Sequence, residues 1–357
     1  MKNVFMLINK ITFQKDYYFK SLITELSNQG IKTFIQKKQI NKFPFFSSLL
    51  SSKCKILHIH WMPIAGYSKK NILKIILKLI QLILDTYLTK YILKAKIVWT
   101  IHNLYSHETY YPRLEKVGRR FLSKKVDLII SHCISAKVKI SQEYKVSSNK
   151  IFVIPHGNYF QCYKNNITKE KARDKLNLKK EDFVFLHFGR IRPYKGIDIL
   201  VNNFNSLETN KRIKLLIVGK CRNKSLKSYL LKASEQNKNI ILKFGYIPDN
   251  EIQIYMNAAD IVVIYYKEIL TSGETLLAIS FGKPIIAPRL GCINDILDDD
   301  GSILYNVSDK TGLITALKTG IKKGNDLAKM GKYNMELAKN FDWKLIGKQT
   351  KELYDKI

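Results

Sequence analysis

The sequence lacks the patterns that mark common cofactor and metal sites. No GxGxxG follows the first strand-like run of either half, which disfavours a nicotinamide or flavin enzyme. The few cysteines include no CxxC pair, and their odd number fits reduced thiols better than a disulfide framework. They are Cys54, Cys133, Cys162, Cys221 and Cys292. We therefore expect neither a metal site nor a disulfide-stapled secreted protein.

Long apolar runs are also missing. The most apolar stretch, residues 71–88, is interrupted by Lys74, Lys78, Gln81 and Asp85, whereas a spanning helix needs about 20 nearly uninterrupted apolar residues. The first ten residues are too short in their apolar part for a signal peptide and resemble a buried strand instead. These features predict a cytoplasmic protein in which residues 71–88 form a helix that lies against a surface.

Acidic residues are scarce. The chain has 61 Lys and Arg against 29 Asp and Glu, a net charge of +32, and residues 1–170 hold 29 basic and 8 acidic residues, a net +21. Such a half suits nucleic acid or an anionic membrane surface, where each nearby Lys or Arg contributes about 1 kcal/mol. A lysine-rich solvated surface explains the charge equally well.

Short apolar, β-branched runs alternate with helical spacers throughout the chain. In parallel sheets covered on both faces, strands have this near-continuous apolar character. The expected strands of the first half are 3–8, 31–36, 55–60, 96–101, 126–131 and 150–155, and those of the second are 183–188, 213–218, 239–244, 260–265, 283–288 and 302–305.

Twelve strands exceed one compact doubly wound sheet, and the polar stretch 163–182 divides them six and six. We therefore predict an α/β protein of two Rossmann-like domains facing across a cleft. Ligands bind at the carboxyl ends of parallel strands, which fixes where site residues are sought.

The stretch "LHFGRIRPYKGIDIL" (186–200) is a candidate diphosphate site. A buried strand ends at Gly189, and Arg190 and Lys195 follow in a turn before a helix that starts near Gly196. Arg binds two oxygens with its planar fork and Lys acts as a point charge. In so basic a protein, a turn that is basic without function is the alternative.

The stretch "EILTSGETLLAISFGKP" (268–284) is a second candidate, because a buried helix begins near Ser272 and Gly273. Amides at a helix start carry about half a positive charge and attract anions. An ordinary helix capped by Thr271 or Ser272 is the alternative.

Taken together, "FGRIRPYKG", "LLIVGK", "FGYIPDNEIQIYMNAADIVV" and "TSGETLLAISFGKPIIAP" resemble the donor domain of GT-B glycosyltransferases of the retaining family four. In the first half, "HIHWMP", "WTIHNLYSHE", "SHCISA" and "IPHGNY" are similar to the acceptor domain of a subgroup that builds bacterial surface polysaccharides. The resemblance implies an acceptor domain over 1–165, a nucleotide-sugar domain over 166–340, and a closing helix over 341–357 that packs back on the first domain.

The resemblance also implies site residues in the second domain. Arg190 and Lys195 would bind the diphosphate and stabilise the leaving phosphate, and the other donor-binding residues would be Gly189, Tyr246, Ile247, Thr271, Ser272, Gly273 and Glu274. The family's paired glutamates would fall on Ile269 and Leu277, so neither is present. Glu274 lies one helical turn before position 277, where it would hold the ribose or merely complement the helix dipole.

In the first domain, the resemblance places His102 beside the transferred sugar as a catalytic residue. Asn103, His107, Glu108 and His156 are the implied acceptor-binding residues. His58 and His60 alternate onto one strand face, a spacing also found in metal sites, but no third ligand is apparent.

The implied activity is transfer of a hexose-type sugar, with retention and without a metal or cofactor. The donor would be a UDP- or GDP-sugar. The acceptor would be a lipid-linked or growing saccharide of a capsule, exopolysaccharide or lipopolysaccharide, at the inner face of the cell membrane. No carboxylate is identified for double displacement, so front-face displacement is expected. No DxD motif of the kind used by metal-dependent transferases is found, and the cluster Asp298-Asp299-Asp300 is interpreted as a solvated loop. The alternatives are a basic nucleic-acid-binding protein, for which no RRM, KH or helix-turn-helix signature is found, and an inactive nucleotide-sugar-binding homologue.

Overall fold

The computed structural model describes residues 2–37, 42–62, 71–106, 109–207 and 212–357. The chain divides into unit 1, residues 1–157 with 341–357, and unit 2, residues 158–340. The division thus falls after Gly157, before the predicted boundary at residue 165. His107 and Glu108, two predicted acceptor-binding residues, lie outside the described residues.

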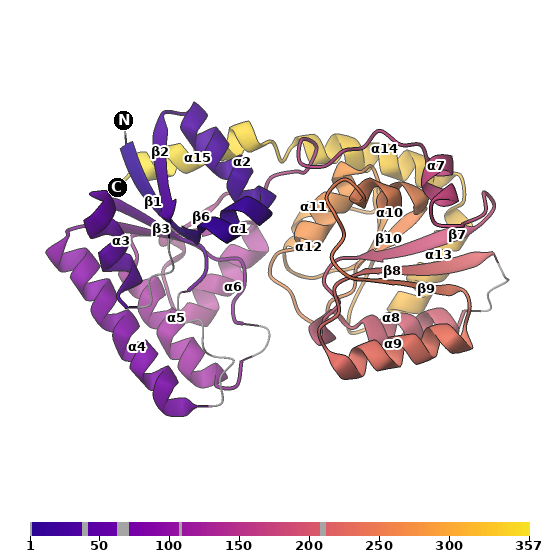
Figure 1. Ribbon diagram of the computed structural model, residues 1–357, viewed down its shortest axis with the longest axis horizontal. Helices are drawn as coiled ribbons and strands as arrows, with labels where there is room; N and C mark the ends of the chain where they lie inside the picture. Colours follow the sequence, from indigo (N-terminus) through magenta and orange to yellow (C-terminus); the bar gives the residue numbers. More distant parts are fainter. Residues whose placement is uncertain (1, 38–41, 63–70, 107–108, 208–211) are drawn as a thin grey trace. The chain divides into compact units, whose positions relative to one another are not determined.

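In the described part of unit 1, a parallel six-stranded sheet has the order β2-β1-β3-β4-β5-β6. Helices α3 to α6 lie on one face, and α1, α2 and α15 on the other (Figure 1). Its elements are β1 (Lys2–Asn9), α1 (Lys10–Lys15), α2 (Tyr17–Asn28), β2 (Ile31–Gln36), α3 (Pro44–Ser52), β3 (Ile56–Ile59), α4 (Ile72–Tyr87), a π-helix (Leu88–Ile92), β4 (Lys96–Thr100), α5 (Pro112–Lys125), β5 (Leu128–Ser131), α6 (Ile134–Tyr144), a 3₁₀ turn (Ser148–Lys150), β6 (Ile151–Val153) and α15 (Trp343–Asp355).

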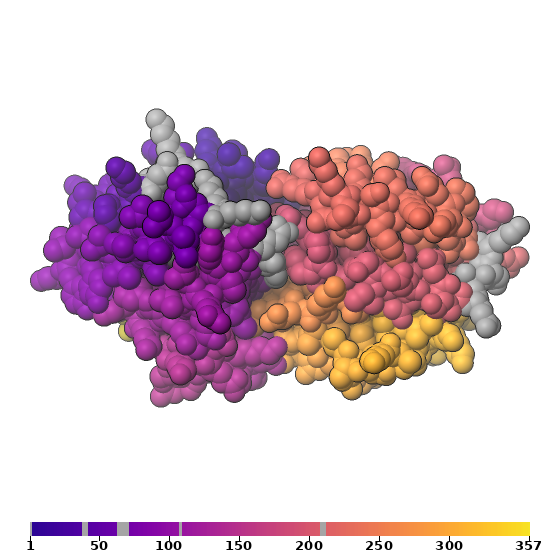
Figure 2. All heavy atoms as spheres, turned by 90° about the horizontal axis from the view of Figure 1, so that it is seen from below, coloured from indigo at the N-terminus to yellow at the C-terminus, as the bar shows by residue number. Residues whose placement is uncertain are grey.

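In the described part of unit 2, a second parallel six-stranded sheet has the order β12-β11-β10-β7-β8-β9. Atoms of α13 and α14, orange to yellow in Figure 2, lie at the surface of this unit. Its elements are α7 (Lys169–Asp174), β7 (Phe183–Phe188), a 3₁₀ turn (Pro193–Lys195), α8 (Ile197–Asn205), β8 (Ile213–Gly219), α9 (Lys224–Gln236), β9 (Ile240–Phe244), α10 (Ile252–Ala258), β10 (Ile261–Val263), α11 (Gly273–Ser280), β11 (Ile285–Pro288), α12 (Gly291–Ile296), β12 (Ser302–Tyr305), α13 (Gly312–Lys323) and α14 (Asp326–Lys339).

Two six-stranded parallel sheets with flanking helices confirm the predicted α/β fold class. Strands β3 and β5, each of which has a neighbouring strand on both sides, are buried along their whole length, as expected for strands covered on both faces. Every predicted strand is present within a residue or two of its expected ends.

The closing helix α15 belongs to unit 1 and packs on α2. Asp342 caps α15 by accepting a hydrogen bond from the Lys344 amide. Trp343, Ile346 and Tyr354 enter the core that the apolar face of α2 also lines. Gly347 permits the close approach, since a Cβ there would lie 2.6 Å from Glu25 Cβ.

Helix α4 packs on α3 and α5 but leaves an apolar face exposed. Asn71 caps its start and Asp85, buried near its end, accepts the backbone amides of Phe45 and Phe46 at 2.9 Å. The exposed apolar side chains include Ile72, Leu73, Ile76, Leu77, Ile80 and Leu84. None of the helices in the described ranges is both long and apolar enough to cross a membrane.

Candidate functional site

The predicted donor residues gather at the carboxyl edge of the unit 2 sheet. Gly189 directly follows β7, Tyr266 follows β10 by three residues, and the loop before α11 completes the group. Strands β7 and β10 are hydrogen-bonded neighbours, so segments about 80 residues apart in the chain meet at one point.

Glycine is required at position 189. Its φ of +137° is disfavoured for residues with a side chain, and a Cβ there would overlap Glu274 Oε1 and lie 3.3 Å from Lys195 Nζ. The neighbouring Gly219, with φ of +140°, is packed against the Gly189 carbonyl oxygen. The backbone at Gly189 therefore lies directly beside the side chains of Lys195 and Glu274.

The pair is an ion pair between Lys195 Nζ and Glu274 Oε1. The Lys195 side chain is 5% exposed and that of Glu274 18%. The other carboxylate oxygen, Oε2, accepts a hydrogen bond from the Tyr266 hydroxyl at 2.8 Å. Glu274 is therefore held from both sides by residues of its own unit.

Two further side chains define the electrostatics of this cluster. Burial, and next the charge of Glu274, raises the pKa of Tyr266 well above its usual value, so the hydroxyl stays protonated and donates. Burial lowers the pKa of His187 to about 4, so its imidazole is neutral at pH 7. His187 Nδ1 lies 3.2 Å from the Val263 carbonyl oxygen, and its buried Nε2 has no hydrogen-bond partner among the described residues.

Helix α11 begins at Gly273, where the sequence predicts its start. Ser272 is the N-cap, and its Oγ accepts the Thr275 amide at 3.2 Å. The backbone amides in the first turn of α11 therefore point toward the preceding loop. That loop contains Thr271 and precedes Glu274 in the sequence.

The remaining predicted donor residues lie at the same edge but are more exposed. Arg190, next to Gly189, is exposed and forms no ion pair with any residue in the described ranges. Tyr246 and Ile247 follow β9; the Tyr246 side chain is 73% exposed and its hydroxyl lies 3.5 Å from Asp249 Oδ1.

In unit 1, His102 follows β4 and is part of a chain of histidines. His102 Nε2 lies 3.2 Å from His60 Nδ1, and His102 Nδ1 lies 3.2 Å from His132 Nε2. His132 Nδ1 in turn lies 2.9 Å from the Ile154 carbonyl oxygen. Three adjacent strands thus each contribute one imidazole to the chain.

The Ile154 carbonyl sets the tautomer of each ring in this chain. A carbonyl only accepts, so His132 Nδ1 carries the proton and its Nε2 must accept from His102 Nδ1. By the same step His102 Nε2 accepts from His60 Nδ1. His60 Nε2 is then left as an acceptor, and it is buried without a partner among the described residues.

Burial keeps these imidazoles neutral. It lowers the pKa of His58 and His156 to about 3 and of His132 to about 4, and places those of His60 and His102 well below the usual value. His58 is a structural residue, since its ring nitrogens lie 2.6 Å from the Tyr354 hydroxyl and 2.8 Å from Thr100 Oγ1.

A cavity of about 210 Å³ opens beside these hydrogen-bonded histidines. The residues that line it include His60, Trp61, His102, Asn103, Tyr105 and Arg119. Arg119 donates to the Asn103 carbonyl oxygen at 3.0 Å and to Glu115 at 2.8 Å, which fixes the loop after β4. His156, the other predicted acceptor residue, is half-buried and lies 2.8 Å from the Gly157 carbonyl oxygen through Nδ1.

Several neighbours of the predicted residues were not singled out from the sequence. They are Tyr266 and His187 in unit 2, and His132 and Arg119 in unit 1. A tyrosine just past "DIVVIY" and a histidine inside "FLHFG" are the available signals, since both follow or end a buried strand. Within the described ranges, no group of three His, Cys, Asp or Glu side chains is arranged to hold a metal ion.

Comparison with known proteins agrees with this geometry. Residues 168–337 match the family of glycosyl transferases group 1. The chain is 27% identical over 248 residues to a GDP-mannose:glycolipid 4-beta-D-mannosyltransferase of Xanthomonas campestris pv. campestris, covering 68% of this chain and 64% of that protein. It is 28% identical over 170 residues to a lipopolysaccharide 1,2-N-acetylglucosaminetransferase of Salmonella typhimurium, covering 45% and 44%. The chain thus spans less than two thirds of the length of these relatives.

Among solved structures, Anabaena Alr3699/HepE in complex with UDP has the same fold, with a TM-score of 0.75 at 15% identity and full coverage of both chains. The predicted resemblance is thus confirmed: residues 168–337 match the glycosyl transferases group 1 family, and the chain has the GT-B fold.

Proposed function

We propose that this protein is a glycosyltransferase that uses a nucleoside diphosphate sugar bound by unit 2. The observation that carries the proposal is the cluster of Lys195, Glu274 and Tyr266 around Gly189, at the carboxyl edge of a glycosyl transferases group 1 domain. The relatives named for glycolipid and lipopolysaccharide sugar transfer support the same class of reaction.

In this proposal the diphosphate lies between the turn after β7 and the start of α11. Lys195 is already neutralised by Glu274, so the exposed Arg190 and the α11 amides supply the net positive charge. Fixed positive groups stabilise the charge that develops on the leaving phosphate as the sugar–phosphate bond breaks.

Glu274 orients Lys195 in this scheme. Its two oxygens already bind Lys195 and Tyr266, so a bound donor meets a fixed carboxylate rather than a mobile one. A sugar or ribose hydroxyl that donates to Glu274 would share an oxygen with one of these partners.

Retention, a hexose-type sugar and independence from metal remain part of the proposal. No carboxylate is identified as a nucleophile, so we propose front-face displacement, in which the departing phosphate oxygen takes the acceptor proton. The Asp298-Asp299-Asp300 cluster follows α12, away from the Lys195–Glu274 pair in the sequence, and the proposed diphosphate position is served by the cationic side chains of Arg190 and Lys195.

The acceptor is proposed to be a lipid-linked saccharide of a bacterial surface polysaccharide. His102 and Asn103 line the cavity of unit 1, and the unpartnered acceptor nitrogen of His60 suits a sugar hydroxyl. The exposed apolar face of α4 and the net charge of +32 support a cytoplasmic enzyme bound peripherally to an anionic membrane.

The test is a screen of nucleotide sugars, beginning with GDP-mannose and UDP-sugars, for thermal stabilisation and for transfer to a polyprenyl diphosphate saccharide. We expect one donor to stabilise the wild type and to be turned over, and Arg190→Ala and Lys195→Met to reduce turnover by about 100-fold or more.

Stabilisation without turnover of any donor would favour an inactive sugar-nucleotide-binding protein. Tight RNA binding that Arg190→Ala leaves unchanged, with no response to any nucleotide, would instead favour the nucleic-acid-binding alternative.

A further inference from the structure

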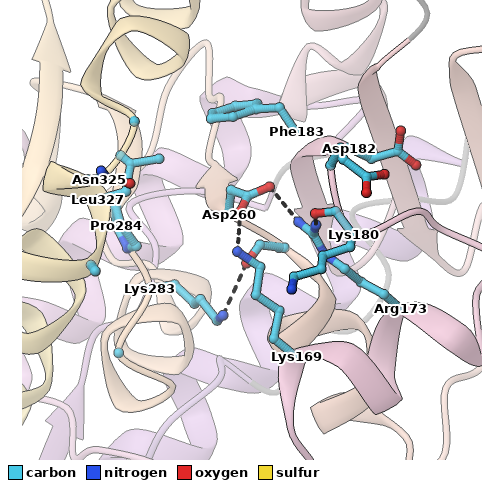
Figure 3. A pocket seen from close by; sticks show the side chains of 15 residues that line it. Lys169, Arg173, Lys180, Asp182, Phe183, Asp260, Lys283, Pro284, Asn325 and Leu327 are labelled. Atoms are coloured by element: carbon cyan, nitrogen blue, oxygen red, sulfur yellow. Dashed lines mark hydrogen bonds and ion pairs between the residues drawn. The ribbon is translucent and has the colours of Figure 1, made fainter.

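A cationic cavity lies in unit 2, at the amino edge of the sheet. Its volume is about 630 Å³, within the range of small-molecule sites. It is lined at the start of β7 by Asp182 and Phe183, before β10 by Asp260, before β11 by Lys283 and Pro284, and on α7 by Lys169 and Arg173 (Figure 3). Because β7 is six residues long, this cavity is about 20 Å from Gly189.

The two oxygens of Asp260 are already occupied. Oδ1 pairs with Lys169 Nζ, while Oδ2 accepts from Arg173 Nη2 at 2.7 Å and from the Val184 amide at 2.7 Å. Asp260 is 12% exposed and Arg173 5%. One carboxylate therefore balances two cations and has no free oxygen for a third.

Lys283 is the third cation, and the Ala259 carbonyl oxygen at 3.1 Å is its hydrogen-bond partner in the described structure. Burial, followed by the charge of Lys169, lowers the pKa of Lys283 to about 8. This half-buried ammonium has a neutral carbonyl and no carboxylate within ion-pair distance in the described structure, although the charge of Asp260 still acts on it.

Lys180 is the fourth cation, from the loop before β7. Lys180 is exposed, lines the cavity and forms no ion pair with a described residue. Asp182 lines the cavity as a carboxylate whose Oδ2 accepts the Lys179 amide at 2.8 Å, and it forms no ion pair with Lys283 or Lys180 in the described structure. The remaining carboxylate of the lining, Glu181, is exposed.

We propose that this cavity is a binding site for a small phosphate-bearing anion, held by Lys283 and Lys180, with the Arg173–Asp260 ion pair forming one wall. A phosphate group carries two or more negative charges on adjacent oxygens. These charges match the cations that line the cavity from α7, the loop before β7 and the residues just before β11. The site is separate from the proposed donor site, because its residues lie at the opposite ends of the same strands.

The test is calorimetric titration of the full chain with inorganic pyrophosphate at constant ionic strength. Lys195→Met, at the donor site, is expected to leave one binding event intact. Lys283→Met is expected to weaken that event about tenfold or more and Lys180→Gln about threefold, as for loss of one charge-assisted contact each. The matched control is Lys175→Gln, an exposed lysine outside the cavity lining, which should bind as the wild type does.

Lys180→Gln keeps the test valid if Lys283→Met does not fold, because Lys180 is exposed. A second titration with phosphatidylcholine vesicles containing phosphatidic acid separates a lipid headgroup from a soluble phosphate. Weakening by the Lys283 or Lys180 substitution in either titration supports the site. Equal affinity of both variants and wild type, or binding that only Lys195→Met removes, overturns it.

Discussion

At the scale of single residues, the chemistry of unit 2 depends on which groups hold Glu274. The family's glutamate positions are Ile269 and Leu277 in this chain, yet a carboxylate still reaches the cluster from position 274. It reaches Lys195 and Tyr266 because Gly189 leaves space for it.

Glu274→Gln should expose how much the ion pair stabilises unit 2. The amide keeps a polar group near Tyr266 but leaves the buried Lys195 without its counter-ion, so the free energy of unfolding should fall by about 3 kcal/mol. Urea unfolding measures this. Glu268→Gln, an exposed carboxylate of the same loop, should change it by less than about 0.5 kcal/mol. Equal effects of the two substitutions would show that the pair has no stabilising role.

Gly189→Ala and Gly245→Ala form a matched pair. Their φ angles are +137° and +140°, but an added Cβ meets Glu274 at position 189 and nothing within 4 Å at position 245. Gly245→Ala should therefore show only backbone strain, about 1–2 kcal/mol, while Gly189→Ala should lose more stability and also nucleotide binding. Urea unfolding and thermal shift with UDP or GDP report the two effects, and similar losses in both variants would refute the role given to the close approach.

At the scale of elements, the ends of β3, β4 and β5 place His60, His102 and His132 in one hydrogen-bonded chain. His60 and His132 are buried and His102 is half-buried, and the lowered pKa of each keeps all three rings neutral at pH 7. The arrangement stabilises the neutral tautomers and makes protonation of the folded state unfavourable.

Stability of unit 1 should consequently fall in acid. A histidine whose folded-state pKa is below its unfolded value near 6.5 contributes stability that is present above pH 6.5 and is lost as pH falls toward the folded value. For His132, with a folded pKa of about 4, the loss between pH 7 and pH 5 is about 1–2 kcal/mol. Urea unfolding across this range should show a steeper decline in the wild type than in His132→Asn.

Asp85 acts in the opposite direction, and the same comparison removes its effect. Burial raises the pKa of Asp85 to about 6, so its protonation stabilises the folded state as pH falls. Asp85 is present in both the wild type and His132→Asn, so its effect cancels when their free energies of unfolding are subtracted. Parallel pH profiles for wild type and His132→Asn would contradict the assignment of neutral, buried histidines.

At the scale of the whole molecule, the sequence predicts the layers better than the site. The apolar runs are long and continuous, so the two sheets and the start of α11 at Gly273 follow from local patterns. The contact of Lys195 with Glu274 does not, because it joins residues 79 positions apart through the β7–β10 pairing, which no local period encodes. The same holds for the histidine chain, whose members are 30 and 42 positions apart.

Net charge is also a property of the whole molecule, and it predicts membrane binding in two steps. The charge of +32 attracts anionic lipid and is screened by salt. The α4 face then adds a salt-resistant part, since Leu73 and Leu77 are 68% and 65% exposed and lie one helical turn apart. The wild-type protein should therefore bind vesicles of phosphatidylcholine and phosphatidylglycerol strongly at low salt. At about 0.5 M salt it should still bind them, weakly but measurably.

Leu73→Gln with Leu77→Gln should abolish the salt-resistant part and keep low-salt binding, because the charge is unchanged. The matched control is Ile134→Gln, which removes an equally exposed apolar side chain (68%) from α6 and should bind as the wild type does. Vesicle co-sedimentation over a salt series measures both parts. Absence of wild-type binding at low salt would exclude the membrane role, and an equal loss in both variants would exclude α4 as the docking face.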